Sequence, residues 1–428
     1  MVLEEFERRY LELFWKRQRY QWDNYVHGSG HDLCVVDGEM FELATSYRDQ
    51  RHPSGRQTDI LHAIVSRELV DKHPDVRRLR NRLDDWNNYA HGLTEAEAED
   101  PLYYRLGLAR RMKPDVLELI RTRNLLAQRS GFPSYVELVL STEDIQFEPL
   151  ITFLDSYVEE NMPNVHRLIR THTPSLSLPT WFSHLATIGR IEGGLNHDQI
   201  AAELLRRMGF GELANRIHVT SNEQGLPGYV GVLSVPDDIR VLVRPPDSLA
   251  RWLTLFHELG HAVAHASNTT AGVFRTWTGV HDESMAAVME RIAAKVMLDG
   301  GNLRSARGVF ALETARCAIS ALFEFALWEH PKAAESLYAE YYGRLGVDIG
   351  SPEIWPLDSF RSIDPVYVHN YVIADRVAER TIEFLDKKYG DDIERWGEWL
   401  TGNYYADGRS RSLFEKTKSI GFSSEWIT

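Results

Sequence analysis

The chain has 428 residues, of which 43% are hydrophobic and 11% aromatic, a balance typical of a globular protein with one large core or two lobes. The formal net charge of −14 argues against a nucleic-acid partner, because such a partner needs a local basic surface. No apolar run approaches the roughly 18 residues of a membrane span, so we expect no membrane partner.

The cysteine content is low, with only Cys34 and Cys317 present and no metal-binding or redox spacing between them. Because disulfides concentrate in oxidising compartments, this usage predicts a cytoplasmic protein. No feature of the sequence indicates an oligomeric state.

The first half of the chain carries the apolar periodicity of helices, interrupted by segments rich in Pro, Ser and Gly at 52–55 and 174–179. We expect residues 1–215 to form a helical region that makes one wall of a cleft. The helices predicted for this half span about residues 4–27, 57–90, 102–130, 146–171 and 197–209.

A strand signal follows this helical half. Two segments rich in branched residues, 228–235 and 239–243, flank a Pro-Asp-Asp turn and predict a β-hairpin. The edge of such a hairpin can bind an extended peptide through main-chain hydrogen bonds. We therefore predict that Tyr229, Val230 and Gly231 bind substrate, with a purely structural hairpin as the alternative.

The next segment, 249–266, has apolar residues at three- and four-residue spacing and predicts an amphipathic helix. It carries His257 and His261, which lie on one side of the helix and can reach a single zinc ion. Glu258 beside them can act as the catalytic base on a zinc-bound water. Gly260 weakens the helix, which indicates a close approach of another segment at that point. The alternative is an ordinary helix with two surface histidines.

A third metal ligand is expected on the following predicted helix, which covers about residues 280–296. A catalytic zinc site usually has three protein ligands and one open position, and we assign the third ligand to Glu283. Asp282 and His281 are adjacent competitors. Glu290 lies two helical turns after Glu283, and we predict that it supports a ligand histidine rather than the metal itself. The alternative for Glu290 is a solvated or ion-paired helix residue.

The combination of segments 257–261 and 283–290 resembles the zinc helices of the thimet oligopeptidase and oligoendopeptidase F family of gluzincin metallopeptidases. Segment 123–138, with its Gly-Phe turn and Ser-Tyr pair, and segment 367–372 are similar to the family in the same order. The resemblance implies a mainly α, two-lobed zincin-type fold with a small sheet beside the zinc helix. It also implies one Zn²⁺ per chain, held in a catalytic region that spans 216–428.

The resemblance also implies roles for the aromatic run near the C-terminus. Tyr371 is the expected donor to the oxyanion, because a phenol at that position stabilises the transition state more than the ground state. Tyr367, one helical turn earlier, is expected to share this catalytic task by binding substrate, and His369, which lies between them on another face, is a further candidate catalytic residue. The alternative for these residues is packing in the core.

Three features depart from the family pattern. Arg361 stands about where the family has a histidine before its catalytic tyrosine. The third histidine of the zinc helix, His265, comes four residues after His261, whereas the family has it three residues after. The chain is also shorter than the usual member.

We predict a zinc-dependent oligoendopeptidase that hydrolyses short peptides in a deep cleft. One alternative is a carboxypeptidase-like helical zincin, in which Arg240, Arg244 or Arg361 binds the C-terminal carboxylate of the substrate. The other is a catalytically inactive homologue that binds peptide or zinc.

Overall fold

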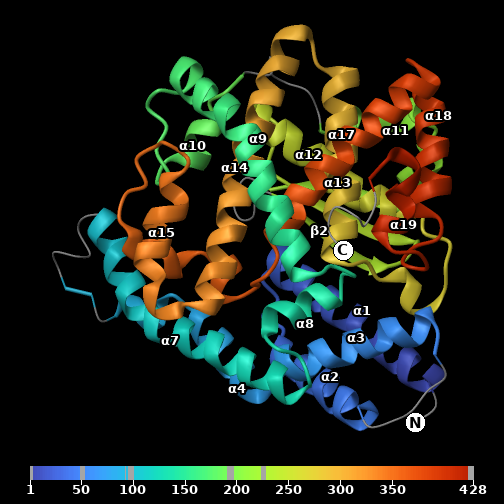
Figure 1. Ribbon diagram of the computed structural model, residues 1–428. Helices are drawn as coiled ribbons and strands as arrows, with labels where there is room; N and C mark the ends of the chain where they lie inside the picture. Colours follow the sequence, from blue (N-terminus) through green and yellow to red (C-terminus); the bar gives the residue numbers. More distant parts are fainter. Residues whose placement is uncertain are drawn as a thin grey trace.

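The protein is described by a computed structural model that covers residues 3–48, 54–91, 93–94, 101–189, 197–222 and 228–422. Helices dominate these residues and a three-stranded sheet accompanies them, which confirms the mainly α fold class (Figure 1). The elements are α1 (Leu3–His27), α2 (Leu33–Tyr47), α3 (Arg56–Asp71), α4 (Pro74–Asp84), α5 (Asn87–Ala90), α7 (Pro101–Arg129), α8 (Tyr135–Ser141), α9 (Phe147–His172), α10 (Trp181–Leu185), α11 (His197–Arg207), β1 (Ile217–Ser221), β2 (Gly228–Ser234), β3 (Asp238–Val243), α12 (Leu249–Ala266), α13 (Gly279–Met297), α14 (Gly300–Glu329), α15 (Ala334–Gly343), α16 (Ser359–Ser362), α17 (His369–Tyr389), α18 (Ile393–Leu400) and α19 (Leu413–Thr417).

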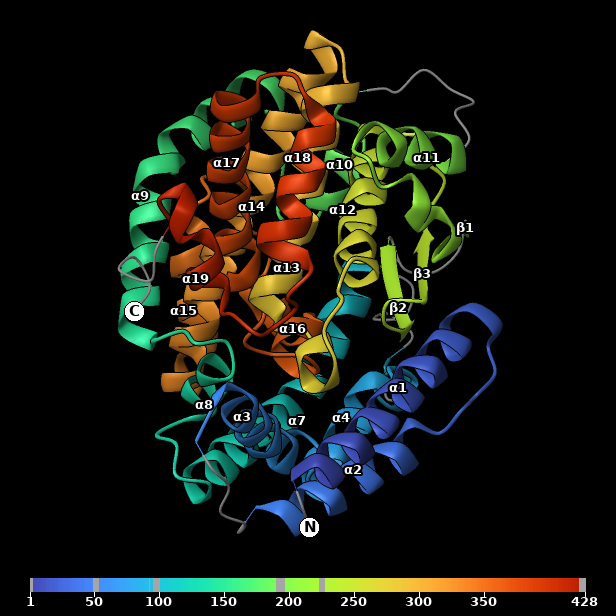
Figure 2. The ribbon, with the colours of Figure 1, turned by 90° about the vertical axis from the view of Figure 1, so that its right-hand side faces the viewer.

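The helices form an upper body and a lower layer. In the body, α12, α13 and α17 pack side by side, with α13 in contact with both of its neighbours (Figure 2). Helices α1 to α4 and α7 form the layer beneath this body. The site described below lies in α12, α13 and the start of α17, so the lower layer borders it from one side.

The sheet has the strand order β1-β3-β2, with β1 parallel and β2 antiparallel to β3. Alternate residues of a strand face opposite sides, and both sides of this sheet are covered. Ile239 and Val241 belong to the main core, which includes α12, whereas Leu233 and Leu242 pack on Trp22 of α1. The sheet is therefore held between α12 and α1, with β2 as its edge strand.

Two core clusters stabilise the described residues besides the small one around Trp22. The largest joins side chains from Val70 at the end of α3 through to Phe422 and crosses position 215, and the other joins α1, α2 and α3 to Val273. The expected division at residues 215 and 216 stays a prediction.

One predicted helix is divided, and proline explains one of its two breaks. The predicted helix 57–90 forms α3, α4 and α5, and Pro74 begins α4 with His73 as its N-cap. Pro331 likewise follows the end of α14 and precedes α15. A proline lacks the N–H that an interior helical turn needs, yet α7 and α9 continue through Pro114 and Pro163.

Several short elements were not predicted from the sequence, and neither were helix α2 and strand β1. Helix α2 contains Gly38 and several β-branched residues, which weaken a helical pattern, and it begins where the Asp32 side chain accepts a hydrogen bond from the backbone N–H of Cys34. Strand β1 has only five residues and exists through its parallel pairing with β3. Of the predicted break at 52–55, residues 52 and 53 lie outside the described residues.

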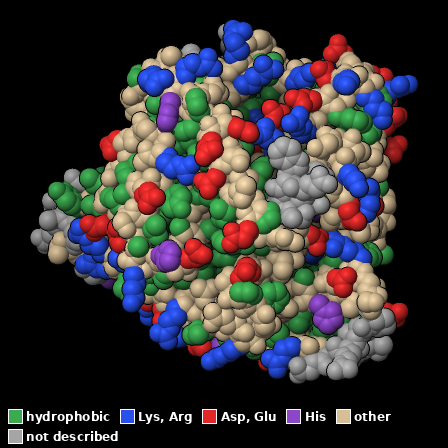
Figure 3. Space-filling model, viewed as in Figure 1, with side chains coloured by type: hydrophobic (Ala, Val, Ile, Leu, Met, Phe, Trp, Pro, Cys, Tyr) green, Lys and Arg blue, Asp and Glu red, His purple; other side chains and the backbone are tan. Residues whose placement is uncertain are grey.

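The surface gives no sign of a polyanion-binding face where it can be seen. Acidic and basic side chains are interspersed on the face shown in Figure 3. Among the described residues, no helix combines the length and the apolar character needed to cross a bilayer.

The contact between α12 and α13 depends on a glycine. A Cβ atom at Gly260 would lie 2.7 Å from the Cα atom of Ala286 and 2.8 Å from the carbonyl oxygen of Met285, both on α13. Real Cβ atoms do not approach backbone this closely, so only glycine permits the observed helix separation. This is the close approach that the glycine in the H-E-L-G-H run predicted.

We expect Gly260→Ala to lower the free energy of unfolding by about 1–3 kcal/mol, because the new methyl group must push α13 away from α12. Gly308→Ala on α14 is the matched control, since no atom lies within 4 Å of its Cβ position. That change should stabilise the protein by up to about 1 kcal/mol through helix propensity. Denaturant unfolding measures both, and effects of the same sign would contradict the packing constraint.

Candidate metal centre

Two histidines and one glutamate converge between α12 and α13. Helix α12 begins at Ser248, whose side chain accepts a hydrogen bond from the backbone N–H of Arg251, and it presents His257 and His261 on successive turns. Helix α13 presents Glu283 to them. One ligand atom from each of these three residues lies within 4.8 Å of the other two.

Both histidines face the Glu283 carboxylate through their Nε2 atoms. The Oε2 atom of Glu283 lies 3.1 Å from Nε2 of His257 and 4.0 Å from Nε2 of His261. A tetrahedral zinc ion with ligands at about 2.1 Å needs donor atoms about 3.4 Å apart. The donor set and its spacing therefore fit a zinc ion.

The opposite nitrogens of both rings are held by carboxylates. The Nδ1 atom of His261 lies 2.9 Å from Oδ1 of Asp282, and Nδ1 of His257 lies 3.5 Å from Oε2 of Glu290. A carboxylate at Nδ1 keeps the proton on that nitrogen and leaves Nε2 free to bind a metal. Glu290 is thus next to a ligand histidine, as the prediction of a supporting role requires.

Asp282 lies against two histidines of α12, whereas the sequence suggested it only as a rival of Glu283 for the metal. It faces the Nδ1 side of His261 and also lies 3.4 Å from Nε2 of His265. Because successive residues on a helix point about 100° apart, Asp282 and Glu283 cannot take the same position. The signal in the sequence for this supporting position was that Asp282 directly precedes the expected ligand Glu283, on a helix that follows the histidine-bearing one.

The site is rich in negative charge, which raises the pKa of both histidines. Burial alone would lower the pKa of His261, but Asp282 and then Glu283 raise it to about 9. Burial opposes a similar rise in the pKa of His257, which Glu283 and Glu290 hold well above its ordinary value. The buried carboxylates thus favour positive charge at this point, either as protons or as a metal cation.

Glu258 lies beside this group and faces the sheet. A Cβ atom at Gly228, the first residue of β2, would collide with the Glu258 carboxylate. Glycine at that position therefore leaves room for Glu258 between the metal ligands and the edge strand. Burial raises the pKa of the Glu258 carboxyl, and Glu283 and Asp282 add to the rise while the two histidines oppose it.

Two tyrosines close the other side. The Tyr367 hydroxyl donates to Oε1 of Glu283 at 2.5 Å, and the Tyr371 ring lies 6.4 Å from the ring of His257. Burial and then the charge of Glu283 raise the pKa of both phenols well above the ordinary value. Both hydroxyls therefore keep their protons at neutral pH and can donate hydrogen bonds.

The loop that carries Tyr367 is held by a buried acid. The backbone N–H of Val366 donates to Oε1 of Glu324 on α14 at 2.6 Å, and Val366 has a φ of 60°. A β-branched residue rarely adopts this conformation, so it indicates that the surrounding contacts determine the loop. Burial raises the pKa of Glu324 to about 7.

His369 is not brought to this group. Its side chain is fully buried, packs against Phe325 with ring centroids 5.9 Å apart, and finds no hydrogen-bond partner among the described residues. Burial lowers the pKa of His369 to about 3. A side chain in this position cannot touch a substrate in the cleft, in contrast to the expected catalytic role, because its place in the first turn of α17 turns it into the core.

A cavity of about 410 Å³ lies between α1, β2 and the start of α13, and it is lined by Asp282 and Tyr367 but by none of His257, His261 and Glu283. Tyr229 and Val230 line it, together with Trp15 of α1 and with Asp282 and Tyr367 of the site. Gly231 has a different place, because a Cβ atom there would collide with the ring of Trp22. Its main chain belongs to the edge strand, and because glycine has no side chain, the Trp22 ring of α1 can pack directly on the sheet at this position.

The arginines considered for a substrate carboxylate have partners of their own. Arg240 forms a two-pronged ion pair with Asp238, at 2.9 and 3.0 Å. Arg361 is buried and paired with Asp358. Arg275 lines the 410 Å³ cavity, and its Nε–H donates to the carbonyl oxygen of Thr270. Arg275 was not among the arginines predicted from the sequence.

The fold matches solved peptidase structures. An M32 carboxypeptidase from Deinococcus radiodurans R1 aligns with a TM-score of 0.66 and 13% identity, over 98% of this chain and 95% of that chain. PZ peptidase A aligns with a TM-score of 0.67 and 14% identity, over 95% of this chain and 83% of that chain. A protein named as a candidate oligoendopeptidase F aligns with a TM-score of 0.64 and 15% identity, over 92% and 81%.

At these identities the likeness shows the fold alone, which this chain shares with the carboxypeptidase and oligopeptidase structures named above. No protein-family model and no curated protein sequence matches the chain.

We expect Asp282→Ala to weaken zinc binding by about 10- to 100-fold, because His261 then lacks the carboxylate that orients its ring. Asp282→Asn, which can keep the hydrogen bond but not the charge, should lose less. The control is Asp391→Asn, an exposed acid far along the chain. Competition with a chromophoric chelator measures the affinity, and an unchanged affinity in the alanine variant would exclude the supporting role.

Proposed function

We propose that the protein is a zinc-dependent peptidase that cleaves short peptides internally. The observation that carries this proposal is the convergence of two imidazole Nε2 atoms and the Glu283 carboxylate beside an open cavity, with Glu258 and two tyrosine hydroxyls around them. Metal ligands, a general base and an oxyanion donor make up a complete set for metal-assisted hydrolysis.

His257, His261 and Glu283 would hold the ion, one Zn²⁺ per chain. A zinc ion at this place would supply Lewis acidity, which polarises a carbonyl group and makes water acidic near neutral pH. Two neutral imidazoles and one carboxylate neutralise only part of a dication, so these three side chains would leave the site with a net positive charge.

Glu258 accepts the proton of the attacking water and passes it to the leaving amine. Its carboxyl group stands between the metal ligands and Gly228, where the substrate's main chain would run along β2. The raised pKa of Glu258 suits this task, because a base that must also return the proton works best near the operating pH.

Tyr371 donates to the carbonyl oxygen as negative charge develops there. Its raised pKa keeps the donor proton in place, and its ring stands against His257. Tyr367, whose hydroxyl is on Glu283, holds that carboxylate and lines the cavity where substrate binds.

The substrate main chain pairs with the edge of β2 at Tyr229 and Val230, opposite α1. Such pairing reads the backbone and not the side chains, so it favours many short sequences. Helix α1 covers the approach to this strand, which supports a cleft that admits unfolded peptides and excludes folded proteins.

We expect Glu258→Gln to lower kcat by about 100- to 10,000-fold while the protein keeps its zinc, because the amide cannot take the proton. Glu398→Gln, an exposed change on α18, is the control. Hydrolysis of an internally quenched peptide library and metal analysis by mass spectrometry give the two readouts. A variant that keeps most of its activity would rule out Glu258 as the base.

A carboxypeptidase is the second candidate, because the chain shares its fold with an M32 carboxypeptidase and a cation lines the cavity beside the site. Arg275, in the cavity beside Tyr367, is a cation within the substrate path. An exopeptidase needs such a group for the terminal carboxylate of its substrate.

A single peptide with a free or an amidated C-terminus separates the two candidates. The internal peptidase proposed here should cleave both forms at similar kcat/KM. A carboxypeptidase would lose at least about tenfold on amidation, because a lost charge-assisted hydrogen bond costs roughly 1.5–3 kcal/mol. Mass spectrometry of the products identifies the bonds that are cut.

A further inference from the structure

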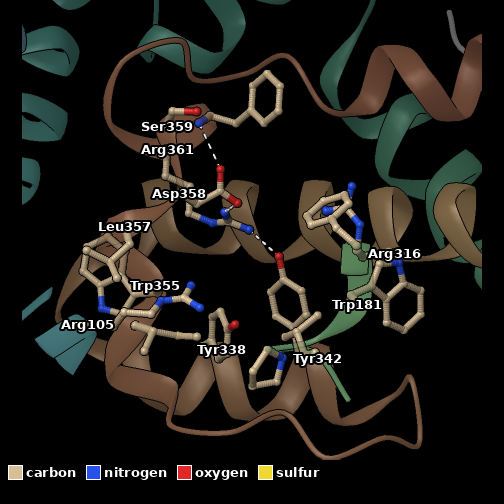
Figure 4. Close-up of a pocket in the computed structure, with 15 residues that line it drawn as sticks. Arg105, Trp181, Arg316, Tyr338, Tyr342, Trp355, Leu357, Asp358, Ser359 and Arg361 are labelled. Carbon is tan, nitrogen blue, oxygen red and sulfur yellow. Dashed lines mark hydrogen bonds and ion pairs between the residues drawn. The ribbon is translucent and has the colours of Figure 1, made fainter. Parts of the chain in front are cut away.

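A second pocket, of about 340 Å³, lies apart from the metal ligands between α7, α10, α14, α15 and the segment 352–361 (Figure 4). Its size is at the lower end of the range that holds small organic ligands. None of the residues of the candidate metal centre lines it.

The walls of this pocket are aromatic. Tyr338 and Tyr342 stack with ring centroids 4.3 Å apart, and the rings of Trp181 and Trp355 complete the lining. The indole N–H groups of the two tryptophans donate to Glu313 and Glu335, so their polar atoms are already bonded and their rings serve as apolar walls. At the rim, Phe182 keeps 65% of its surface exposed, which is unusual for a large aromatic side chain.

The pocket also carries excess positive charge. Three arginines line it, and two of them have carboxylate partners, Arg361 with Asp358 and Arg316 with Glu313. Arg105 is exposed and forms no hydrogen bond or ion pair with any described residue. Burial raises the pKa of the Tyr338 phenol, and the charges of Arg361 and then of Arg105 oppose this rise. Its guanidinium group lies on the pocket side, close to Trp355 and Tyr338 (Figure 4).

One ring separates this pocket from the metal centre. Phe360 lines the pocket and stacks on Tyr367 with ring centroids 5.8 Å apart and planes 3° apart. Tyr367 in turn donates to Glu283. A ligand that moves Phe360 therefore acts on a side chain bonded to a predicted metal ligand.

We propose that this pocket is a second binding site, for a small carboxylate with an aromatic body. The aromatic walls take the flat body of the ligand, and Arg105 supplies the charge-assisted hydrogen bonds for its carboxylate. Arg316, whose guanidinium lies 4.7 Å from the ring of Phe182, borders the same space. The site itself is independent of the proposed activity, whereas its effect on the metal centre through Phe360 rests on that activity.

The binding test uses 3-phenylpropionate and its neutral amide as probes, with isothermal titration calorimetry on the zinc-loaded and on the chelator-treated protein. We expect the carboxylate to bind at least about tenfold more tightly than the amide, with or without zinc. Equal binding of the two probes, or binding that disappears with the metal, would overturn the proposal.

Two variants locate the binding. Arg105→Gln should weaken the carboxylate about tenfold and leave the amide unchanged, whereas Phe182→Ala should weaken both probes. Arg121→Gln is the control, because it removes the same charge from an exposed position further along α7. An unchanged affinity in Arg105→Gln would also overturn the proposal.

Peptide hydrolysis then distinguishes the source of the ligand. If the pocket takes the C-terminal aromatic residue of a substrate, 3-phenylpropionate raises KM for a peptide ending in free phenylalanine and leaves kcat unchanged. If it takes a separate molecule, the probe changes kcat, and Arg105→Gln abolishes that change. A protein that binds the probe but hydrolyses no peptide would refute the peptidase and leave the pocket in place.

Discussion

The close packing of α12 on α13 is the constraint on which the site depends. Gly260 lets the two backbones approach until a single carboxylate on α13 faces the Nε2 atoms of two histidines on α12. A helix pair at the usual separation of 8–10 Å, with side chains in the contact, would hold Glu283 further from both rings. The helix-weakening residue in the middle of the site is therefore explained by geometry.

Buried charge has to be balanced, and in the candidate metal centre two groups of carboxylates contribute to this balance. Each histidine has one nitrogen toward Glu283 and the other toward a second carboxylate, so neither ring can rotate without losing a bond. The same carboxylates raise the pKa of both histidines when no cation other than a proton is present. Orientation and charge balance are thus supplied by the same two residues, Asp282 and Glu290.

Helix α1, from the lower layer of helices, packs against the sheet that lies beside the site. Helix α1 packs on the outer face of the sheet through Trp22, while the inner face of the sheet packs on α12. Residues near the N-terminus thereby line the cavity beside Asp282 and Tyr367. On the far side, Phe360 links the same tyrosine to the aromatic pocket, so the metal centre is bordered by two separate spaces.

The sequence by itself determined the helical character, the hairpin and which residues could hold a metal, because apolar periodicity and the spacing of His257, Glu258 and His261 are local properties of one helix. Proline breaks at 74 and 331, the parallel partner β1 and the supporting part of Asp282 needed the tertiary structure. So did the position of His369, which a run of aromatic residues suggested for the cleft and which the start of α17 turns into the core. Which face of a helix meets which neighbour depends on contacts between segments far apart in the chain, and no local pattern contains that information.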